Sequence, residues 1–138
     1  MRVIGFNFDK ISIERKANNK EGMKIGTSID ILQVDKTKTD IIKIKEEIIG
    51  LKFKYNVDYS PDIAKIELEG SIILTIESDI AKEVFKMWKD KKLPEDFRIS
   101  ALNLIYRKSN IRAIQLEDEM NLPLHIPLPV LSKQEDKK

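Results

Sequence analysis

Residues 65–88 read KIELEGSIILTIESDIAKEVFKMW, and the fold is decided where the spacing of apolar side chains changes inside this stretch. Up to Glu77, apolar and polar residues alternate, as in a strand with one buried and one wet face. From Ser78 onward, apolar residues recur every three to four positions, as on one side of an amphipathic helix. The stretch therefore predicts a strand that leads into a helix N-capped by Ser78. The buried stripe of this helix is expected to consist of Ile80, Val84, Phe85, Met87 and Trp88.

Three further strands are predicted before this one. Alternating apolar residues place them at about 4–13, 23–31 and 41–59. Turn and break residues separate the strands at 18–22, 35–40 and 60–62. The apolar residues change face at Asp9–Lys10 and again at Gly50, so a β-bulge is expected at both places. Consecutive strands with short connections favour an antiparallel sheet.

A second helix and an extended tail are predicted after the first helix. Pro94 suits the first turn of a helix that reaches about Met120. Its inner face is expected to comprise Phe97, Ala101, Leu104, Ile105, Ile111 and Ile114. Prolines at three positions then exclude helix from residues 122–131, so we expect an extended strip that packs on its own domain or on a neighbouring subunit.

The predicted fold class is therefore α+β. It combines a four-stranded antiparallel β-sheet with two α-helices that follow it and an extended, Pro-rich C-terminal segment. We expect residues 1–131 to form a single domain, because a chain of 138 residues can bury one core. Residues 132–138 are expected to be a polar, disordered tail.

Composition excludes several classes of function. The chain has no cysteine, which excludes disulfides, thiolate metal sites and a cysteine nucleophile. The net charge is only +2, and basic and acidic residues are interleaved, so we expect neither nucleic acid nor a membrane as a partner. No signal peptide and no apolar run of about 20 residues is found, so a cytoplasmic location is expected.

Residues that can do chemistry are few. His125 is the single histidine, and no nucleophile-elbow or glycine-rich phosphate motif accompanies it. We expect His125 to be a solvated or packing residue. Glu67 and Glu69 share a strand face about 7 Å apart and are expected to be a solvated surface. No catalytic residue, metal ligand or cofactor is therefore predicted, and the protein is expected not to be an enzyme.

Aromatic residues of the sheet suggest a binding role. Phe53, Tyr55 and Tyr59 lie on one face of the predicted strand, where two tyrosines can line a groove with their apolar bodies. The simpler interpretation is that they cover the edge of the core. Trp88 is open to the same two interpretations, because it also belongs to the apolar stripe of its helix.

Two segments resemble the SecB-like export chaperones. Residues 6–14, FNFDKISIE, are similar to the opening strand of that family, and residues 121–131, NLPLHIPLPVL, are similar to its exit from the long helix. The resemblance implies a cytoplasmic homo-oligomer, a dimer or tetramer, that takes part in protein transport and holds non-native polypeptide in apolar grooves without ATP. Bacterial members continue with a further helix and a partner-binding tail, whereas this chain stops soon after Leu131, so hand-off to the export ATPase is not implied.

The leading hypothesis is therefore ATP-independent binding of unfolded polypeptide by a SecB-like chaperone. The alternative is a non-enzymatic adaptor of the same fold that binds one specific folded partner. An enzyme that acts on a small ligand between sheet and helices is a third hypothesis, which a deep polar pocket around His125 or around the Glu67–Glu69 pair would favour. The residues predicted to bind peptide are Phe53, Tyr55, Tyr59, Trp88, Leu124 and Ile126.

Overall fold

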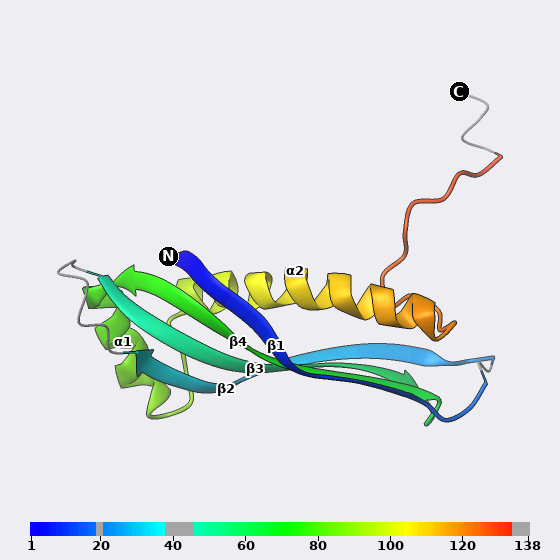
Figure 1. The fold of residues 1–138 in the computed structure, drawn as a ribbon, viewed down its shortest axis with the longest axis horizontal. Coiled ribbons are helices and arrows are strands. Elements are labelled where there is room, and N and C mark those ends of the chain that lie inside the picture. Colours follow the sequence, from blue (N-terminus) through cyan, green and yellow to red (C-terminus); the bar gives the residue numbers. More distant parts are fainter. Residues whose placement is uncertain (19–20, 38–45, 134–138) are drawn as a thin grey trace.

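The computed structural model describes residues 1–18, 21–37 and 46–133. Its elements are β1 (Arg2–Arg15), β2 (Lys24–Thr37), β3 (Glu46–Ser60), β4 (Ala64–Glu77), α1 (Ser78–Trp88) and α2 (Glu95–Glu119). The strands form one antiparallel sheet in the order β1-β4-β3-β2, and the long helix α2 extends along the sheet (Figure 1). The predicted α+β fold, a four-stranded antiparallel sheet followed by two helices, is confirmed.

The two faces of the sheet differ in the way that the alternating sequence predicts. The inner face of β3 and β4 is fully buried, and its largest side chains are Ile49, Leu51, Phe53, Tyr55, Tyr59, Ile66, Leu68, Ile72, Leu74 and Ile76. The outer face is polar. There Glu67 accepts hydrogen bonds from the Nζ atoms of Lys10 and Lys65, each at 3.0 Å, which lower the pKa of the Glu67 carboxyl to about 2. Glu67 and Glu69 are thus part of an ion-paired surface.

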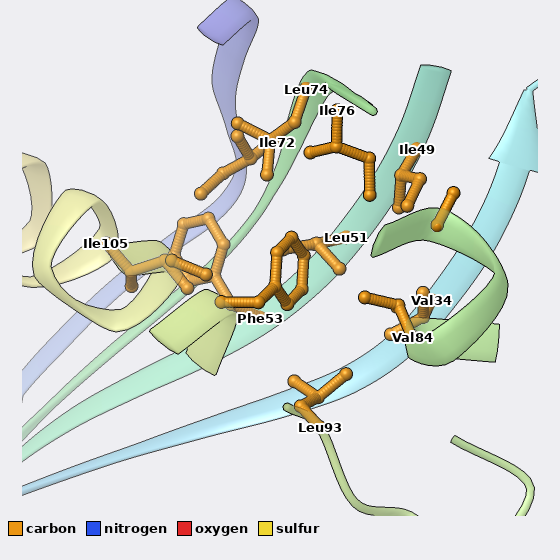
Figure 2. Close-up of a cluster of buried hydrophobic side chains, with 13 residues drawn as sticks. Val34, Ile49, Leu51, Phe53, Ile72, Leu74, Ile76, Val84, Leu93 and Ile105 are labelled. Atoms are coloured by element: carbon orange, nitrogen blue, oxygen red, sulfur yellow. The ribbon is translucent and has the colours of Figure 1, made fainter. Parts of the chain in front are cut away.

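One glycine makes room for the centre of the core. Gly70 pairs with Phe53 on the neighbouring strand. A Cβ atom at Gly70 would collide with the carbonyl oxygen of Asn7 and would lie 2.7 Å from Cζ of Phe53. The Phe53 ring, which Figure 2 shows beside Ile72 and Ile105, fills this space, and Phe6 stacks on it with a centroid separation of 5.4 Å.

Strand irregularities were predicted with mixed success. The bulge at Asp9 is confirmed by a register shift between Phe8 and Lys10. The prediction of a bulge at Gly50 is wrong, because β3 pairs with β4 without interruption. The apparent change of face arose because Ile48 and Ile49 are both buried, although they point to opposite faces.

The second strand differs from the prediction at its end. β2 contains an unpredicted bulge at Leu32, between Ile31 and Gln33. It also continues to Thr37, through the start of the expected break at 35–40. Residues 38–45, with the rest of that break and the expected start of the third strand, lie outside the described residues.

Both helices begin and end close to the predicted positions, but their buried faces differ in part. Glu77 is the N-cap of α1 in place of Ser78, and Ile80 is 40% exposed. Ile111 of α2, which was predicted to face the core, is 53% exposed. The buried residues of α2 are instead Phe97, Ala101, Ile105, Ser109, Ala113, Leu116 and Glu117. Most are spaced by four residues, and the small side chains among them let the helix approach the sheet, which hydrophobicity alone does not indicate.

After α2, residues 122–133 contain neither helix nor strand. Leu122 is buried, whereas Val130 and Leu131 are 79% and 90% exposed. The first half of the segment therefore packs on its own domain, and the second half projects away from the body (Figure 1). Residues 134–138, most of the predicted polar tail, lie outside the described residues.

Candidate functional site

The six residues predicted to bind peptide lie in three separate places. Phe53, Tyr55 and Tyr59 are 0–1% exposed, because α2 and the segment after it cover them. Their side chains belong to the core clusters, and of the three only Tyr59 borders one of the cavities described, a small one near the turn at 60–62. Trp88 is only partly buried at the end of α1. Leu124 and Ile126 are partly buried beyond the C-terminal end of α2.

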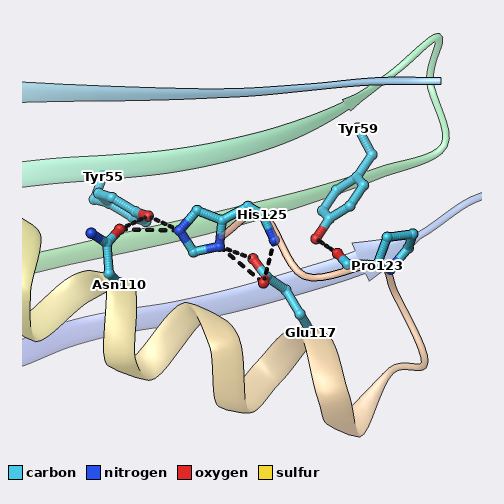
Figure 3. A network of polar contacts seen from close by, with 6 residues as sticks. All are labelled: Tyr55, Tyr59, Asn110, Glu117, Pro123 and His125. Atoms are coloured by element: carbon cyan, nitrogen blue, oxygen red, sulfur yellow. Dashed lines mark hydrogen bonds and ion pairs between the residues drawn. The ribbon is translucent and has the colours of Figure 1, made fainter. Parts of the chain in front are cut away.

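A buried polar network occupies the C-terminal end of α2, which we call the closed end; it comprises Tyr55, Tyr59, Asn110, Glu117, Pro123 and His125 (Figure 3). Nδ1 of His125 lies 2.6 Å from Oε2 of Glu117, and the backbone N–H of His125 donates to Oε1 at 3.0 Å. Nε2 lies 2.9 Å from the Tyr55 hydroxyl and 3.1 Å from Oδ1 of Asn110. The Tyr59 hydroxyl donates to the carbonyl oxygen of Pro123 at 2.5 Å.

This network fastens the exit segment to the domain. With Glu117 as a carboxylate, which can only accept, Nδ1 of His125 is the donor of the contact that joins the ring to it. The side chains of His125 and Glu117 are only 3% and 0% exposed. Burial and the nearby Glu117 carboxylate raise the pKa of the Tyr55 and Tyr59 hydroxyls well above their ordinary value, so both remain neutral donors. The His125 side chain is therefore packed in the interior, which is one of the two environments expected for it.

Sequence reasoning did not find the partner of His125. Glu117 begins an acidic run, residues 117–119, whose composition suggests a solvated surface, but it continues the four-residue buried repeat of α2 after Ser109 and Ala113. The sequence did contain a signal for this pair: Glu117 falls on the buried stripe of α2, and the single histidine, His125, follows it by eight residues.

An open groove lies at the other end of α2, between β2 and the connection from α1 to α2. Its volume is about 600 Å³, and we call it the basic groove; it is lined by Ile29, Ile31, Leu32, Met87, Trp88, Lys91, Lys92, Leu93, Arg98 and Leu102. The bulge in β2 turns Leu32 outward, where it is 47% exposed. β2 ends the strand order of the sheet, so its outer edge has no partner strand among the described residues.

Local backbone geometry gives the groove its second wall. Lys91 adopts a left-handed conformation with φ of 59°, which reverses the chain after α1. Its Nζ lies 4.7 Å from the centroid of the Trp88 ring, a cation–π contact that holds the ring at the rim. The groove is thus framed by an aromatic ring, aliphatic side chains and a strand edge.

A second hollow lies on the other side of α1 and shares only Met87 with the basic groove. Its volume is about 540 Å³, and we call it the acidic hollow; it is lined by Met1, Ile76, Ile80, Glu83, Met87, Pro94, Glu95, Asp96, Phe97 and Ser100. Both cavities are mainly apolar, but the charged side chains in their walls have opposite signs.

In residues 1–18, 21–37 and 46–133, no group of three or more acidic or histidine side chains is placed to hold a metal ion. Within the same ranges, neither helix combines the length and apolar character that crossing a bilayer requires.

Comparison with known proteins supports the fold. The sequence matches no protein-family model and no curated protein sequence. Among solved structures, the chain is similar to the SecB-like chaperone Rv1957 of Mycobacterium tuberculosis, determined in complex with a ChAD peptide from the Rv1956 HigA1 antitoxin. The TM-score is 0.55 at 11% sequence identity, and the match covers 96% of this chain and 91% of the other. The chain therefore has the SecB-like fold that its two sequence segments suggested.

Proposed function

We propose that this SecB-like chain binds non-native polypeptide without ATP, and that the basic groove is where an extended segment of the client lies. The observation that carries the proposal is an open apolar groove beside an unpaired strand edge. A strand edge offers backbone hydrogen bonds to any sequence, and the apolar walls accept any large side chain. Together they supply the sequence-tolerant affinity that a chaperone needs.

Each wall of the groove has a separate function in this proposal. Ile29 and Ile31 are partly exposed on β2, so a client strand that pairs with β2 places alternate side chains toward them. Trp88 presents a flat, partly exposed ring on the opposite wall. Trp88 is thus the residue of the predicted set for which the structure supports a contact with peptide.

Suppression of client aggregation tests the proposal. A chemically unfolded client is diluted into buffer with the protein at a near-stoichiometric ratio, and light scattering is followed. Leu32→Ser should weaken capture roughly fivefold, because about half of a leucine side chain, worth about 1 kcal/mol, is withdrawn from the client contact. Leu128→Ser is the matched control, since Leu128 is 53% exposed on the projecting segment and outside the groove. Unchanged scattering with the unmodified protein would refute the function.

A homo-oligomer, either a dimer or a tetramer, is part of the proposal. It is supported by exposed apolar residues on the edge strand β1, where Val3, Ile4 and Ile11 are 40–49% exposed. Such an edge is normally covered or protected by charge. Light scattering coupled to gel filtration should give a mass of two or four chains, and Ile4→Lys should lower it. A monomer at all concentrations would contradict this part alone.

An adaptor that binds one specific partner is the second candidate. It is favoured by the content of the similar structure, which contains a peptide from a single antitoxin. Capture experiments separate the two candidates, because a chaperone retains many unfolded clients, whereas an adaptor retains one protein in its folded state. For the chaperone, a cytoplasmic location and a contribution to protein transport follow as further parts of the proposal.

A further inference from the structure

The two cavities beside α1 form a natural pair that differs in charge. They have similar volumes, about 600 and 540 Å³, and apolar side chains line most of both. The basic groove carries Lys91, Lys92 and Arg98 and no acid. The acidic hollow carries Glu83, Glu95 and Asp96 and no basic side chain, although the chain's N-terminal residue, Met1, also lines it. Apolar contact alone therefore does not distinguish their ligands, whereas charge does.

The cations of the basic groove are available to a ligand. Lys91, Lys92 and Arg98 are all exposed, and none of them takes part in an ion pair within the described ranges. Some surface lysines elsewhere are held by carboxylates, as Lys10 and Lys65 are by Glu67. Lys91 contacts the Trp88 ring but neutralises no carboxylate within the described ranges, so all three positive charges around the apolar floor attract carboxylates and repel other cations over about 10 Å at ordinary salt.

We infer that the basic groove selects extended segments in which large apolar side chains are flanked by Asp or Glu, and that it disfavours segments flanked by Lys or Arg. This inference rests on the polypeptide binding proposed above and assigns its preferred ligand. The projecting segment of a second copy fits the groove less well, because its apolar residues, Leu128 to Leu131, are followed by Lys133. The peptide would pair with β2, with its apolar side chains between Leu32 and Trp88 and its carboxylates at the basic rim.

Trp88 supplies the assay, because it is the single tryptophan of the chain and lies in the wall of the groove. Three tryptophan-free peptides share one apolar core and carry flanks of Glu, Ser or Lys. Their affinities are measured by Trp88 emission and by anisotropy of a labelled peptide. Exposed ion pairs change affinity a few-fold each, so we expect the Glu peptide to bind about tenfold more tightly than the Ser peptide. The Lys peptide should bind most weakly, and high salt should reduce the differences.

Charge-reversal variants test whether the preference among the three peptides arises in the basic groove. Lys92→Glu/Arg98→Glu should invert the order of the peptides, whereas Glu83→Lys/Asp96→Lys in the acidic hollow should leave it unchanged. Both pairs are exposed, so the fold is expected to tolerate them. Lys91 is kept because of its left-handed backbone and its contact with Trp88.

The outcomes separate this inference from the function itself. Equal binding of all three peptides, tighter binding of the Lys peptide, or an order unaffected by Lys92→Glu/Arg98→Glu would overturn the charge preference and leave polypeptide binding standing. Stronger competition by a peptide of residues 128–133 would assign the groove to a second copy and overturn the inference. Failure of every peptide to bind would refute the proposed function.

Discussion

The two ends of helix α2 cover the same face of the sheet in opposite ways. At the closed end the chain returns over the sheet, and His125 and Glu117 fill the space with paired polar groups. At the other end α1 and its connection stop short of β2, and Trp88 and Leu32 stay in contact with solvent. The comparison shows that aromatic residues on a sheet become core where the chain supplies its own cover, and remain available for binding where it does not.

The largest expected effect comes from breaking the closed end. Glu117→Ala leaves the His125 ring and its backbone N–H without their acceptor in the interior. Loss of one member of a buried pair costs about 3–5 kcal/mol, so urea denaturation should show a free energy of unfolding lower by about that amount. Glu119→Ala, two residues away on the exposed side, should change it by less than about 0.5 kcal/mol. Equal effects of the two variants would contradict a closed, solvent-free network.

A second change asks whether the closed end depends on charge or on filled volume. In the double variant Glu117→Leu/His125→Leu, apolar side chains replace both partners, and such replacements of buried ion pairs are often tolerated. We expect the double variant to be more stable than the sum of the single variants predicts, by about 1–3 kcal/mol in a double-mutant cycle. Strict additivity would mean that the two side chains do not interact in solution.

A smaller effect is expected from one hydroxyl of the same network. Tyr59→Phe removes the hydrogen bond to the carbonyl of Pro123 and should lower the free energy of unfolding by about 1 kcal/mol. Tyr106→Phe is the control, because no hydrogen bond is found for its hydroxyl within the described ranges, and it should be nearly neutral. Limited proteolysis should also cut residues 122–131 faster in Tyr59→Phe; equal rates in the two variants would argue against fastening by Tyr59.

Much of the fold follows from local patterns. Alternation fixes which face of β4 is buried, and the change of period at Ser78 marks the start of α1. The pattern failed where a residue is buried for a non-local reason. Ile48 is buried on the outer face and imitated a bulge at Gly50. The real bulge at Leu32 does change the parity of the apolar residues, from Ile31 to Val34, but the expected strand was ended at Ile31, before the change.

The candidate site was harder to predict than the fold. Alternation along β3 correctly places Tyr55 and Tyr59 on one face of the sheet. It does not indicate whether α2, about forty residues later in the chain, covers that face. Trp88 was left open between core and binding, and its side chain is partly buried and lines the basic groove. The basic rim was missed, since Lys91 and Arg98 come together only through the reversal of the chain between α1 and α2.

The ion pairs on the outer face of the sheet serve as a control, because they lie at neither end of α2. Lys10 and Lys65 lower the pKa of Glu67 to about 2, so the folded state binds a proton there less readily than the unfolded state. The stabilisation from Glu67 should therefore be complete above its ordinary pKa near 4.5 and should disappear as the pH falls toward 2. Glu67→Gln should lower the denaturation midpoint slightly at neutral pH, and the difference should shrink steadily as the pH falls from 4.5 through 2. The difference should be small and sensitive to salt, because the carboxylate is on the surface; a difference that is the same at pH 2 as at neutral pH would contradict this origin.

The smallest effect on stability is expected at the open end. Leu32→Ser changes a side chain that is 47% exposed on a bulge, so the free energy of unfolding should differ from that of the unmodified protein by less than about 0.5 kcal/mol. The same substitution is expected to weaken client capture several-fold, whereas Glu117→Ala should act on stability first. Comparing the loss of client capture with the loss of free energy of unfolding therefore distinguishes a binding residue from a residue that stabilises the fold. If Leu32→Ser instead destabilised the protein as much as Glu117→Ala does, the basic groove would be a part of the core, and the distinction between the two ends of α2 would fail.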